Sequence, residues 1–520
     1  MAGVLAALTA TVTSLVLVGR ASTPPPPPIA YRAAVITASL PFPSDPLVDP
    51  TDPGVAAITP LLYRPLLTLG ATAYPVPDLA SAVSESTDGL RYTLPIRPGL
   101  RWSDGRPITA ADAEATIAWV ESAGFPDPAF AAAWKGVSSA VAGNDLLLTL
   151  ESPRAALPAN LTQLPILPLA GLSPGAVARL AAHPTSPLPT SGPYVVAARR
   201  GPDLILAANP HAEPAPHLSR IALNPVTSFG AAAAAFAGGQ VSAVLATTEA
   251  QAAQLLRHRG AVARDLLTFS FVDLLFNERT PGLGDSAVRR AIADAVDRAG
   301  IVSGAVGGLG VPQVGPIPAG VLWLGAPPSP PAASLADARS ALSAAGWEPG
   351  TAGVLTKGAV SLSFTLSVAD AAPLPAVAQA LAGQLAPLGI SVHVVQMPAR
   401  GFLHQVLEPG SFQLALAAWN AGPDPDVSQF WASTATPPHG YNVSRGPVDS
   451  FLDQDLAMLA TVSGKQQRAA AVRQVTLALA QDLPAVFLYT PEESLVVDGP
   501  LSDVSVPAVG DPFSGAASWR

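Results

Sequence analysis

The sequence predicts an α/β protein of several domains with mixed β-sheets. Strand-like segments alternate along the chain with helix-like segments, which is typical of sheets covered by helices. The 520 residues exceed what one hydrophobic core usually organises. Apolar residues make up 49% of the chain and charged residues 12%, which is the composition of a folded protein with a sizeable core.

The first well-defined elements lie in residues 90–120, LRYTLPIRPGLRWSDGRPITAADAEATIAWV. RYTLPI predicts a short strand, and the Pro-Gly and Asp-Gly pairs after it predict turns. Thr109 with Asp112 three residues later is a capping-box pattern, which predicts the start of a helix. Apolar side chains at positions 113, 117 and 120 then fall on one face of that helix.

Further elements follow from the same signals. A strand at residues 271–276 precedes a helix capped by Asp285. Ser334, with an acid three residues on, starts a helix that ends at Gly346. Alternation within residues 360–368 predicts a half-buried strand. The remaining expected elements are a helix and a strand within 376–395, a strand at 411–419, a helix at 464–482 and a strand at 485–490.

The N-terminus resembles a secretion signal. Residues 3–19 are apolar and uncharged, and five prolines follow at residues 24–28. This order is typical of a signal sequence and a stiff spacer, with a short membrane anchor as the alternative. Arg20 stands where a bacterial lipoprotein carries its acylated Cys, so acylation there is impossible. We expect an exported, extracytoplasmic monomer that associates with the membrane at most through this segment.

Composition and motifs argue against nucleic acid and against catalysis. The formal net charge is −9 without a Lys/Arg run, and there is no cysteine. The seven histidines lack metal-ligand spacing, and phosphate loops and nucleophile motifs are missing. Asp424 and Asp426 could serve acid–base chemistry, but turn formation by Asp-Pro explains them. We predict no catalytic residue, no metal and no cofactor; a hydrolase would need an acid–His or Ser–His cluster.

Four segments resemble the family 5 extracellular solute-binding proteins of ABC importers, which include the oligopeptide- and dipeptide-binding proteins. The segments are residues 90–120, PTSGPYVV at 189–196, residues 274–302, and the run from 377 to 431 that ends in LALAAWNAGPDPDVSQFW. The resemblance spans about residues 55–500 in the right order. It implies a two-lobed periplasmic-binding-protein-like fold (type II, three-domain cluster) with a hinge, in which residues 90–120 are framework.

The resemblance also implies the division of the chain. Two lobes close over a solute, and a membrane permease recognises the closed form. The expected parts are a signal-like segment and spacer at 1–29, a discontinuous domain I at 30–58, 186–268 and 491–520, an inserted domain II at 59–185, and a domain III at 269–490.

The candidate site departs from the family pattern at one position. In peptide-binding members an Asp three residues after the strand-end Trp binds the amino group of the peptide. Here Trp419 is followed by Asn420, Ala421 and Gly422, so glycine holds that position and Asp424 lies two residues further. This leaves a shifted salt bridge, a blocked peptide, a neutral ligand or no ligand. The expected ligand-binding residues are Trp419, Asn420, Ala421, Asp424, Trp323 and Tyr441.

Two functions follow from the resemblance. In the first, the protein binds a peptide-like or other small polar solute and delivers it to ABC permease subunits. In the second, it is a non-transport envelope protein of the same fold that binds or regulates the assembly of cell-wall glycolipid, such as phosphatidylinositol mannosides and lipoglycans. Low charge, the Ala- and Pro-rich composition and the missing amine-binding Asp resemble that second branch.

Overall fold

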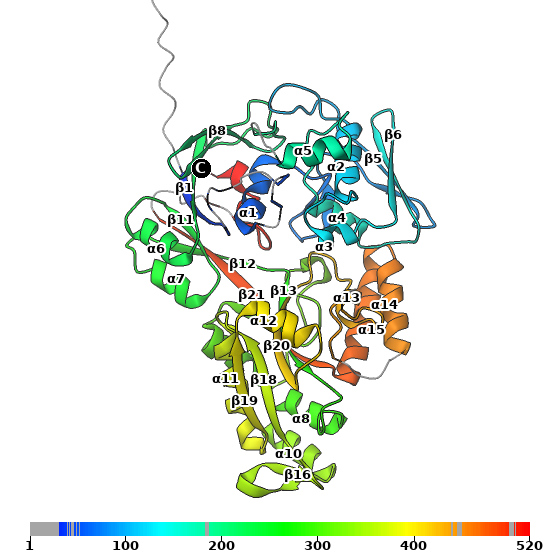
Figure 1. Ribbon diagram of the computed structural model, residues 1–520, viewed down its shortest axis with the longest axis vertical. Helices are drawn as coiled ribbons and strands as arrows, with labels where there is room; N and C mark the ends of the chain where they lie inside the picture. The colour runs from blue at the N-terminus through cyan, green and yellow to red at the C-terminus, as the bar shows by residue number, and fades with distance from the viewer. Residues whose placement is uncertain are drawn as a thin grey trace, which may run out of the picture.

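The protein consists of two lobes that lie one above the other (Figure 1). The computed structural model describes residues 31–38, 40, 42, 46–47, 49–50, 52–182, 187–437, 440–444, 450–498, 504 and 506–519. The predicted signal-like segment, its polyproline run and Arg20 lie outside these residues. The expected two-lobed α/β fold with mixed sheets is confirmed.

A twelve-stranded mixed sheet runs through both lobes. Its strand order is β19-β18-β20-β13-β21-β11-β1-β10-β9-β8, and β12 and β14 also pair with β21. In the upper lobe β1 pairs in parallel with β10 and β11, whereas β9 pairs antiparallel with β10 and β8. The upper strands are β1 (Tyr31–Ile36), β8 (Tyr194–Arg200), β9 (Asp203–Ala208), β10 (Arg220–Val226), β11 (Ala243–Ala246) and β12 (Val262–Leu267), with helices α1 (Pro53–Leu62), α6 (Phe229–Ala237) and α7 (Glu249–Leu255).

The lower lobe carries the other half of this sheet. β18 pairs in parallel with β19 and β20, and β13 pairs antiparallel with β20. Its strands are β13 (Ser270–Phe276), β14 (Gly310–Pro312), β18 (Ser363–Ala369), β19 (Ser391–Met397) and β20 (Leu414–Asn420), with a small sheet of β15 (Glu348–Pro349), β16 (Leu355–Lys357) and β17 (Val360–Ser361). Its helices are α8 (Ser286–Ala295), α9 (Arg298–Ile301), α10 (Leu335–Ala344), α11 (Leu374–Leu385), α12 (Ala399–Gly401), α13 (Ser428–Trp431), α14 (Ser450–Thr461) and α15 (Lys465–Asp482).

One long strand, β21 (Ala485–Val497), connects the two halves of the sheet (Figure 1). Up to Pro491 it pairs with β13 and β14, and from Glu492 on it pairs with β12 and β11. Both ends of β21 are buried, and its middle at Pro491 to Glu493 is half-buried. The second covalent connection between the lobes is the pair Thr268 and Phe269, which joins β12 to β13.

Each lobe has an apolar core of its own. One buried cluster contains only residues between Phe271 and Tyr489. A second cluster combines residues from Tyr31 to Leu223 with Ala243 and residues from Leu495 to Trp519, and a smaller third cluster around α6 and α7 also lies in the upper lobe. Because the two cores are separate and are joined by β21 and by residues 268–269, the lobes can move as two bodies about these connections. The predicted domain limits remain a prediction, and β21 changes its pairing partners next to the expected boundary at 490/491.

The inserted part of the upper lobe builds a second, four-stranded sheet. Its order is β4-β5-β7-β6, and helix α2 packs against β6 and β7. The elements are β2 (Leu67–Leu69), β3 (Pro75–Pro77), β4 (Ser84–Glu85), β5 (Arg91–Pro95), β6 (Val137–Ala142), β7 (Asp145–Leu150), α2 (Ala110–Val120), α3 (Pro128–Ala132), α4 (Leu157–Gln163) and α5 (Pro174–Ala182).

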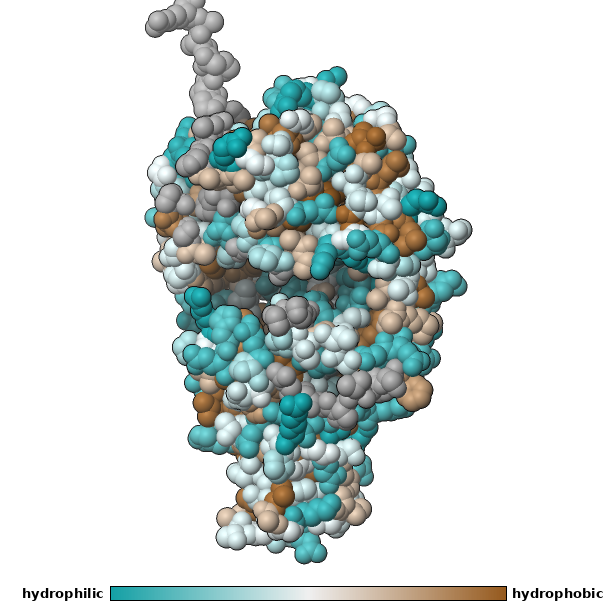
Figure 2. Space-filling model, turned by 45° about the vertical axis from the view of Figure 1, so that its right-hand side comes forward, coloured by the Kyte–Doolittle hydropathy of each residue, from teal (hydrophilic) through white to brown (hydrophobic). Residues whose placement is uncertain are grey.

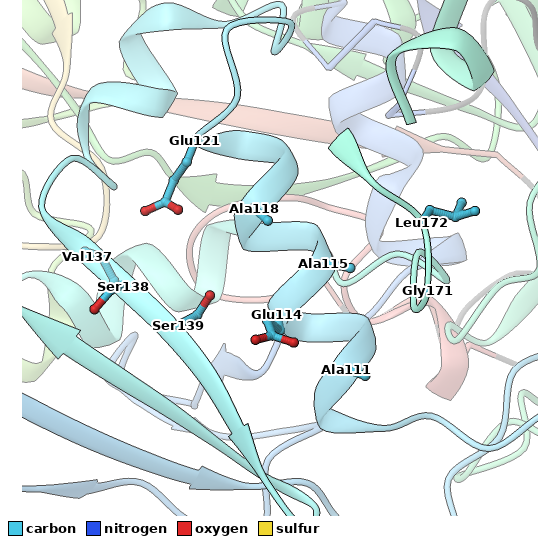
Figure 3. A pocket seen from close by; sticks show the side chains of 10 residues that line it. All are labelled: Ala111, Glu114, Ala115, Ala118, Glu121, Val137, Ser138, Ser139, Gly171 and Leu172. Carbon is cyan, nitrogen blue, oxygen red and sulfur yellow. The ribbon is translucent and has the colours of Figure 1, made fainter. Parts of the chain in front are cut away.

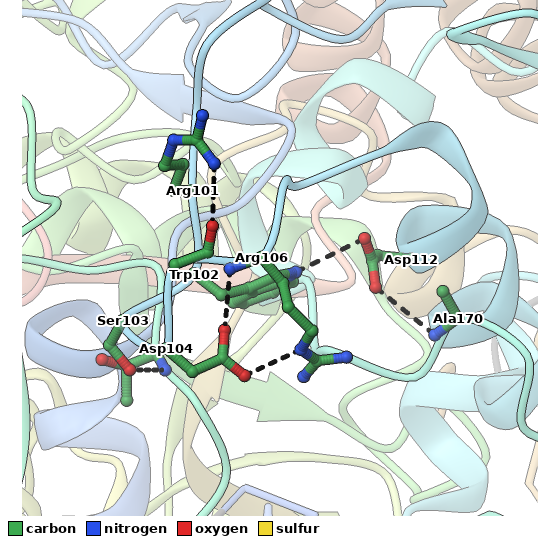
Figure 4. Close-up of polar contacts among 9 residues, drawn as sticks. Arg101, Trp102, Ser103, Asp104, Arg106, Asp112 and Ala170 are labelled. Carbon is green, nitrogen blue, oxygen red and sulfur yellow. Dashed lines mark hydrogen bonds and ion pairs between the residues drawn. The ribbon is translucent and has the colours of Figure 1, made fainter.

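Residues 90–120 hold this insertion together through Asp112. Asp112 is 3% exposed, and its carboxylate accepts hydrogen bonds from Thr109 N at 3.0 Å, Trp102 Nε1 at 3.4 Å and Ala170 N at 3.3 Å. Figure 4 shows the bonds from Trp102 and Ala170. Ser103 Oγ accepts a further bond from Thr190 N at 3.0 Å, which ties the turn to the chain that leads into β8. The predicted capping box is therefore part of a larger framework network.

The predicted helix starts are confirmed, and one strand prediction is corrected. Asp285 accepts from Ala287 N at 3.0 Å, and Ser334 Oγ accepts from Asp337 N at 3.2 Å. Residues 360–368 do not form one half-buried strand. The chain leaves the small sheet at Leu362, whose N donates to Leu355 O, and β18 then runs between β19 and β20. Most of β18 is buried because it is an internal strand covered on both faces.

Candidate ligand-binding site

The carboxyl end of β20 lies at the connection between the lobes. Asn420, its last residue, pairs with Ser270, and Ala421 N donates to Phe269 O at 2.9 Å. β18, β19 and β20 are parallel, so their carboxyl ends meet at one edge of the sheet, where open α/β sheets bind ligands. Figure 2 shows the molecule hollowed between its two lobes.

Three aromatic side chains, Trp419, Phe430 and Tyr441, form an aromatic wall at this end of β20. The ring centres of Trp419 and Phe430 are 5.4 Å apart, and Tyr441 lies 5.6 Å from Trp419 and 5.8 Å from Phe430. Tyr441 is 40% exposed, whereas the other two rings are buried. The structure thus brings two predicted residues together with Phe430 of α13, which the sequence analysis does not single out although this short helix follows the Asp-Pro turn.

Behind this wall lies a buried carboxyl group, Asp273 on β13. It is 0% exposed, and its Oδ1 accepts from Trp419 Nε1 at 3.0 Å. Burial without a charged partner raises the pKa of Asp273 well above its usual range. The sequence reasoning passed over Asp273 because it looks like one polar residue inside an apolar strand.

Asp424 is engaged inside the lower lobe. Its carboxylate forms an ion pair with Arg468 of α15, and the two side chains are 16% and 5% exposed. Oδ1 also accepts from Asp426 N at 2.9 Å, as expected of an Asp-Pro turn. Burial raises the pKa of Asp424, and the Arg468 guanidinium opposes that shift. Arg468 therefore already neutralises the carboxylate that could have provided a shifted salt bridge.

Asn420 to Gly422 form a turn after the strand. Asn420 is exposed, and its Oδ1 accepts from Gly422 N at 3.0 Å. Ala421 is 9% exposed. Gly422 has φ of 75°, a left-handed conformation that glycine adopts without steric cost. Glycine at the family's Asp position therefore matches the local backbone.

Trp323 belongs to a different cluster, which joins the two lobes. Its ring meets Tyr74, which lies between β2 and β3 in the insertion, at 5.4 Å and 79°. The Lys465 ammonium at the start of α15 lies 4.8 Å from the Tyr74 ring centre and 6.0 Å from that of Trp323. Ala155 N also donates to Ala460 O at 2.9 Å. The lobes are in contact here, where α14 and α15 lie below α3 and α4 (Figure 1).

A groove on the insertion is separate from the aromatic wall. It has a volume of about 470 Å³ and lies between α2, the start of β6 and the turn at Gly171. Glu114 of α2 and Glu121, which directly follows that helix, project into it, and Ser139 lies across from them (Figure 3). Burial raises the pKa of Glu121. None of the residues predicted to bind ligand lines this groove.

In the part of the chain that the structure describes, no group of three or more His, Cys, Asp and Glu side chains could hold a metal ion. None of the helices in this part is long and apolar enough to span a membrane.

The model of one protein family, described as bacterial extracellular solute-binding proteins, family 5 middle, matches residues 74–441. The chain belongs to this family. Protein XP55 of Streptomyces lividans is 27% identical over 79% of this chain and 75% of its own length. The oligopeptide-binding protein AppA of Bacillus subtilis is 24% identical over 81% of this chain and 79% of its own length.

Solved structures of the family agree with the fold. AppA in complex with a nonapeptide superposes with a TM-score of 0.70, at 21% identity, over 94% of this chain and 98% of that chain. NikA of Brucella suis in complex with Fe(III)-EDTA superposes with a TM-score of 0.78, at 18% identity, over 94% of this chain and 99% of that chain. Because one fold holds such different solutes, the side chains of the site, and not the fold, determine which solute binds.

Proposed function

We propose that this protein is the extracytoplasmic solute-binding subunit of an ABC importer and holds a peptide-like solute between its lobes. The observation that carries the proposal is the aromatic wall, which ends in the half-exposed ring of Tyr441 at the carboxyl ends of parallel strands. Two separate cores joined by β21 give the lobes the freedom to close over a solute. ABC permease subunits would recognise the closed monomer, and no reaction is catalysed.

The chemistry of the wall favours a ligand without a free amino group at this end. Asp424 is neutralised by Arg468, and Asp273 is buried behind Trp419. Gly422 supplies no side chain at the position where peptide-binding members of the family carry an Asp. An apolar or aromatic group would stack on Tyr441, while the exposed Asn420 amide would bind a backbone carbonyl of the peptide.

The predicted site residues then take different roles. The predicted residues that line the ligand site are Trp419, Asn420, Ala421 and Tyr441. Trp323 stabilises the closed form of the protein through its contacts with Tyr74 and Lys465. Asp424 shapes the loop that carries the wall, and it does not contact the ligand.

Isothermal titration calorimetry with one nonapeptide in free and N-acetylated form tests the proposal. We expect the acetylated form to bind at least as tightly as the free form, because no carboxylate is available for the ammonium. Replacing Tyr441 by Leu should weaken both forms about two- to tenfold, since aromatic stacking contributes about 0.5–1.5 kcal/mol. Leu477→Ala, at a 56% exposed position on α15, is the control and should change nothing.

Two results would contradict the proposal. Strong preference for the free amine would require a carboxylate in the wall. Absence of binding across a peptide panel, together with binding of a phosphatidylinositol mannoside, would favour the glycolipid function instead.

A further inference from the structure

Two buried Trp–Asp pairs lie in the part of the chain that the structure describes, and their surroundings differ. In the framework pair, the carboxylate of Asp112 accepts from Trp102 Nε1 and also from Thr109 N and Ala170 N. In the wall pair, Asp273 Oδ1 accepts from Trp419 Nε1 at 3.0 Å. Its second oxygen, Oδ2, is buried and has no hydrogen-bond partner among the described residues. The first carboxylate is satisfied by several donors and the second by one.

The missing hydrogen bonds of Asp273 indicate that its carboxyl group has a role other than stabilising the fold. A buried polar atom without a partner destabilises the folded state by about 1–3 kcal/mol, and a buried carboxyl group adds its own desolvation. Asp273 is fully buried beside apolar neighbours, with Ala417 opposite it on β20 and Phe487 opposite it on β21. An apolar side chain of similar size would avoid both costs. Stability of the lobe therefore does not explain the carboxyl group.

The register of the strands explains how Asp273 reaches the wall. Phe271 pairs with Trp419, and Asp273 pairs with Ala417, so these side chains lie on one face of the sheet. Ala417 is small, which leaves room for the indole to lie diagonally toward the carboxyl group. The bond fixes the rotation of the Trp419 ring, against which Tyr441 rests at 5.6 Å. The orientation of the exposed ring thus depends on an acceptor that no ligand touches.

We propose that Asp273 is a positioning residue of the ligand site: its Oδ1 holds the Trp419 indole in the one orientation that presents Tyr441 to the solute. The inference deepens the proposed function and rests on it for the identity of the ligand. The geometry of Trp419 itself can be measured without any ligand.

The first measurement is ¹⁹F NMR of protein labelled with 5-fluorotryptophan, in which Trp419→Phe assigns the Trp419 signal among the eight tryptophans. Asp273→Asn keeps an acceptor oxygen and should leave one Trp419 signal near its native position. Asp273→Leu removes the acceptor and should shift the signal or split it, with a smaller loss of melting temperature than Asp112→Leu, because only one donor loses its partner. Asp112→Leu is the matched control, and it should lower the melting temperature because four donors lose their partner: Trp102 Nε1, Thr109 N, Thr109 Oγ1 and Ala170 N.

The second measurement is the affinity for a nonapeptide by calorimetry. We expect Asp273→Leu to weaken binding about two- to tenfold, as loss of one positioning hydrogen bond would, and Asp273→Asn to retain it. If Asp273→Leu does not fold, Asp273→Ala is measured in its place with the same expectations for the fluorine signal and for the affinity.

A Trp419 signal in Asp273→Leu that coincides with the native one would overturn the proposal. So would a loss of melting temperature as large as that of Asp112→Leu, because the carboxyl group would then be structural. Failure of the native protein to bind peptide would refute the proposed function alone, since the fluorine signals are read on the free protein.

Discussion

Replacing Lys465 by Gln is expected to shift the protein toward its open form. The Lys465 ammonium lies 4.8 Å from the Tyr74 ring centre and 6.0 Å from that of Trp323, so it contacts rings of both lobes. At an exposed position such as this, a cation–π interaction contributes about 0.5–1 kcal/mol, and the second ring lies at the limit of the range. The ratio of closed to open molecules should therefore fall about two- to fivefold.

Single-molecule FRET on the free protein measures this ratio. The chain has no cysteine, so one introduced at the exposed Ala140 of β6 and one at the exposed Ser343 of α10 are the only labelling sites. Lys465→Arg keeps the cation and should match the native distribution. Ligand affinity should fall by the same factor as the closed population, because only the closed form holds solute with both lobes. Identical distributions for Gln and the native Lys would refute the role given to this contact.

Three further outcomes are expected. Gly422→Asp should lower the free energy of unfolding by about 1–2 kcal/mol, because φ at this position is 75°. A Cβ at Gly422 meets no atom within 4 Å, so the new carboxylate has room in the site. Calorimetry should therefore show a new preference for free over acetylated peptide. Arg289→Met should lower the free energy of unfolding in urea by about 3–5 kcal/mol, because the buried Glu278 carboxyl loses the guanidinium that lies 3.0 Å from it. Arg290→Met, at an exposed position, is the control. Equal losses in the two variants would contradict the role of the Arg289–Glu278 pair. Burial raises the pKa of Glu278 to about 7, so the folded protein binds this proton more tightly than the unfolded chain does; its stabilisation is complete below pH 4.5 and is lost as the pH rises through 7. Glu278→Gln should flatten the urea stability between pH 5 and 8, and an unchanged slope would exclude Glu278 as its source.

Local signals in the sequence were sufficient for many elements. Asp112, Asp285 and Ser334 cap helices because a short side chain next to free backbone N–H groups decides a helix start within four residues. Such short segments do not encode which residues are buried or paired by elements far away in the sequence. The sequence predicts a strand at 485–490, yet β21 continues to Val497 because β11 and β12 of the upper lobe pair with its second half.

The properties of the candidate site also fall into two groups, those that follow from the sequence and those that only the tertiary structure shows. The sequence by itself determined the family resemblance, the position of Trp419 at a strand end, and the absence of a carboxylate at Gly422. Only the tertiary structure decided that Asp424 is paired with Arg468, that Trp323 joins the lobes, and that Asp273 lies behind Trp419. The physical reason is that partners 44 to 249 positions apart meet only through strand register and helix packing, which no local pattern records.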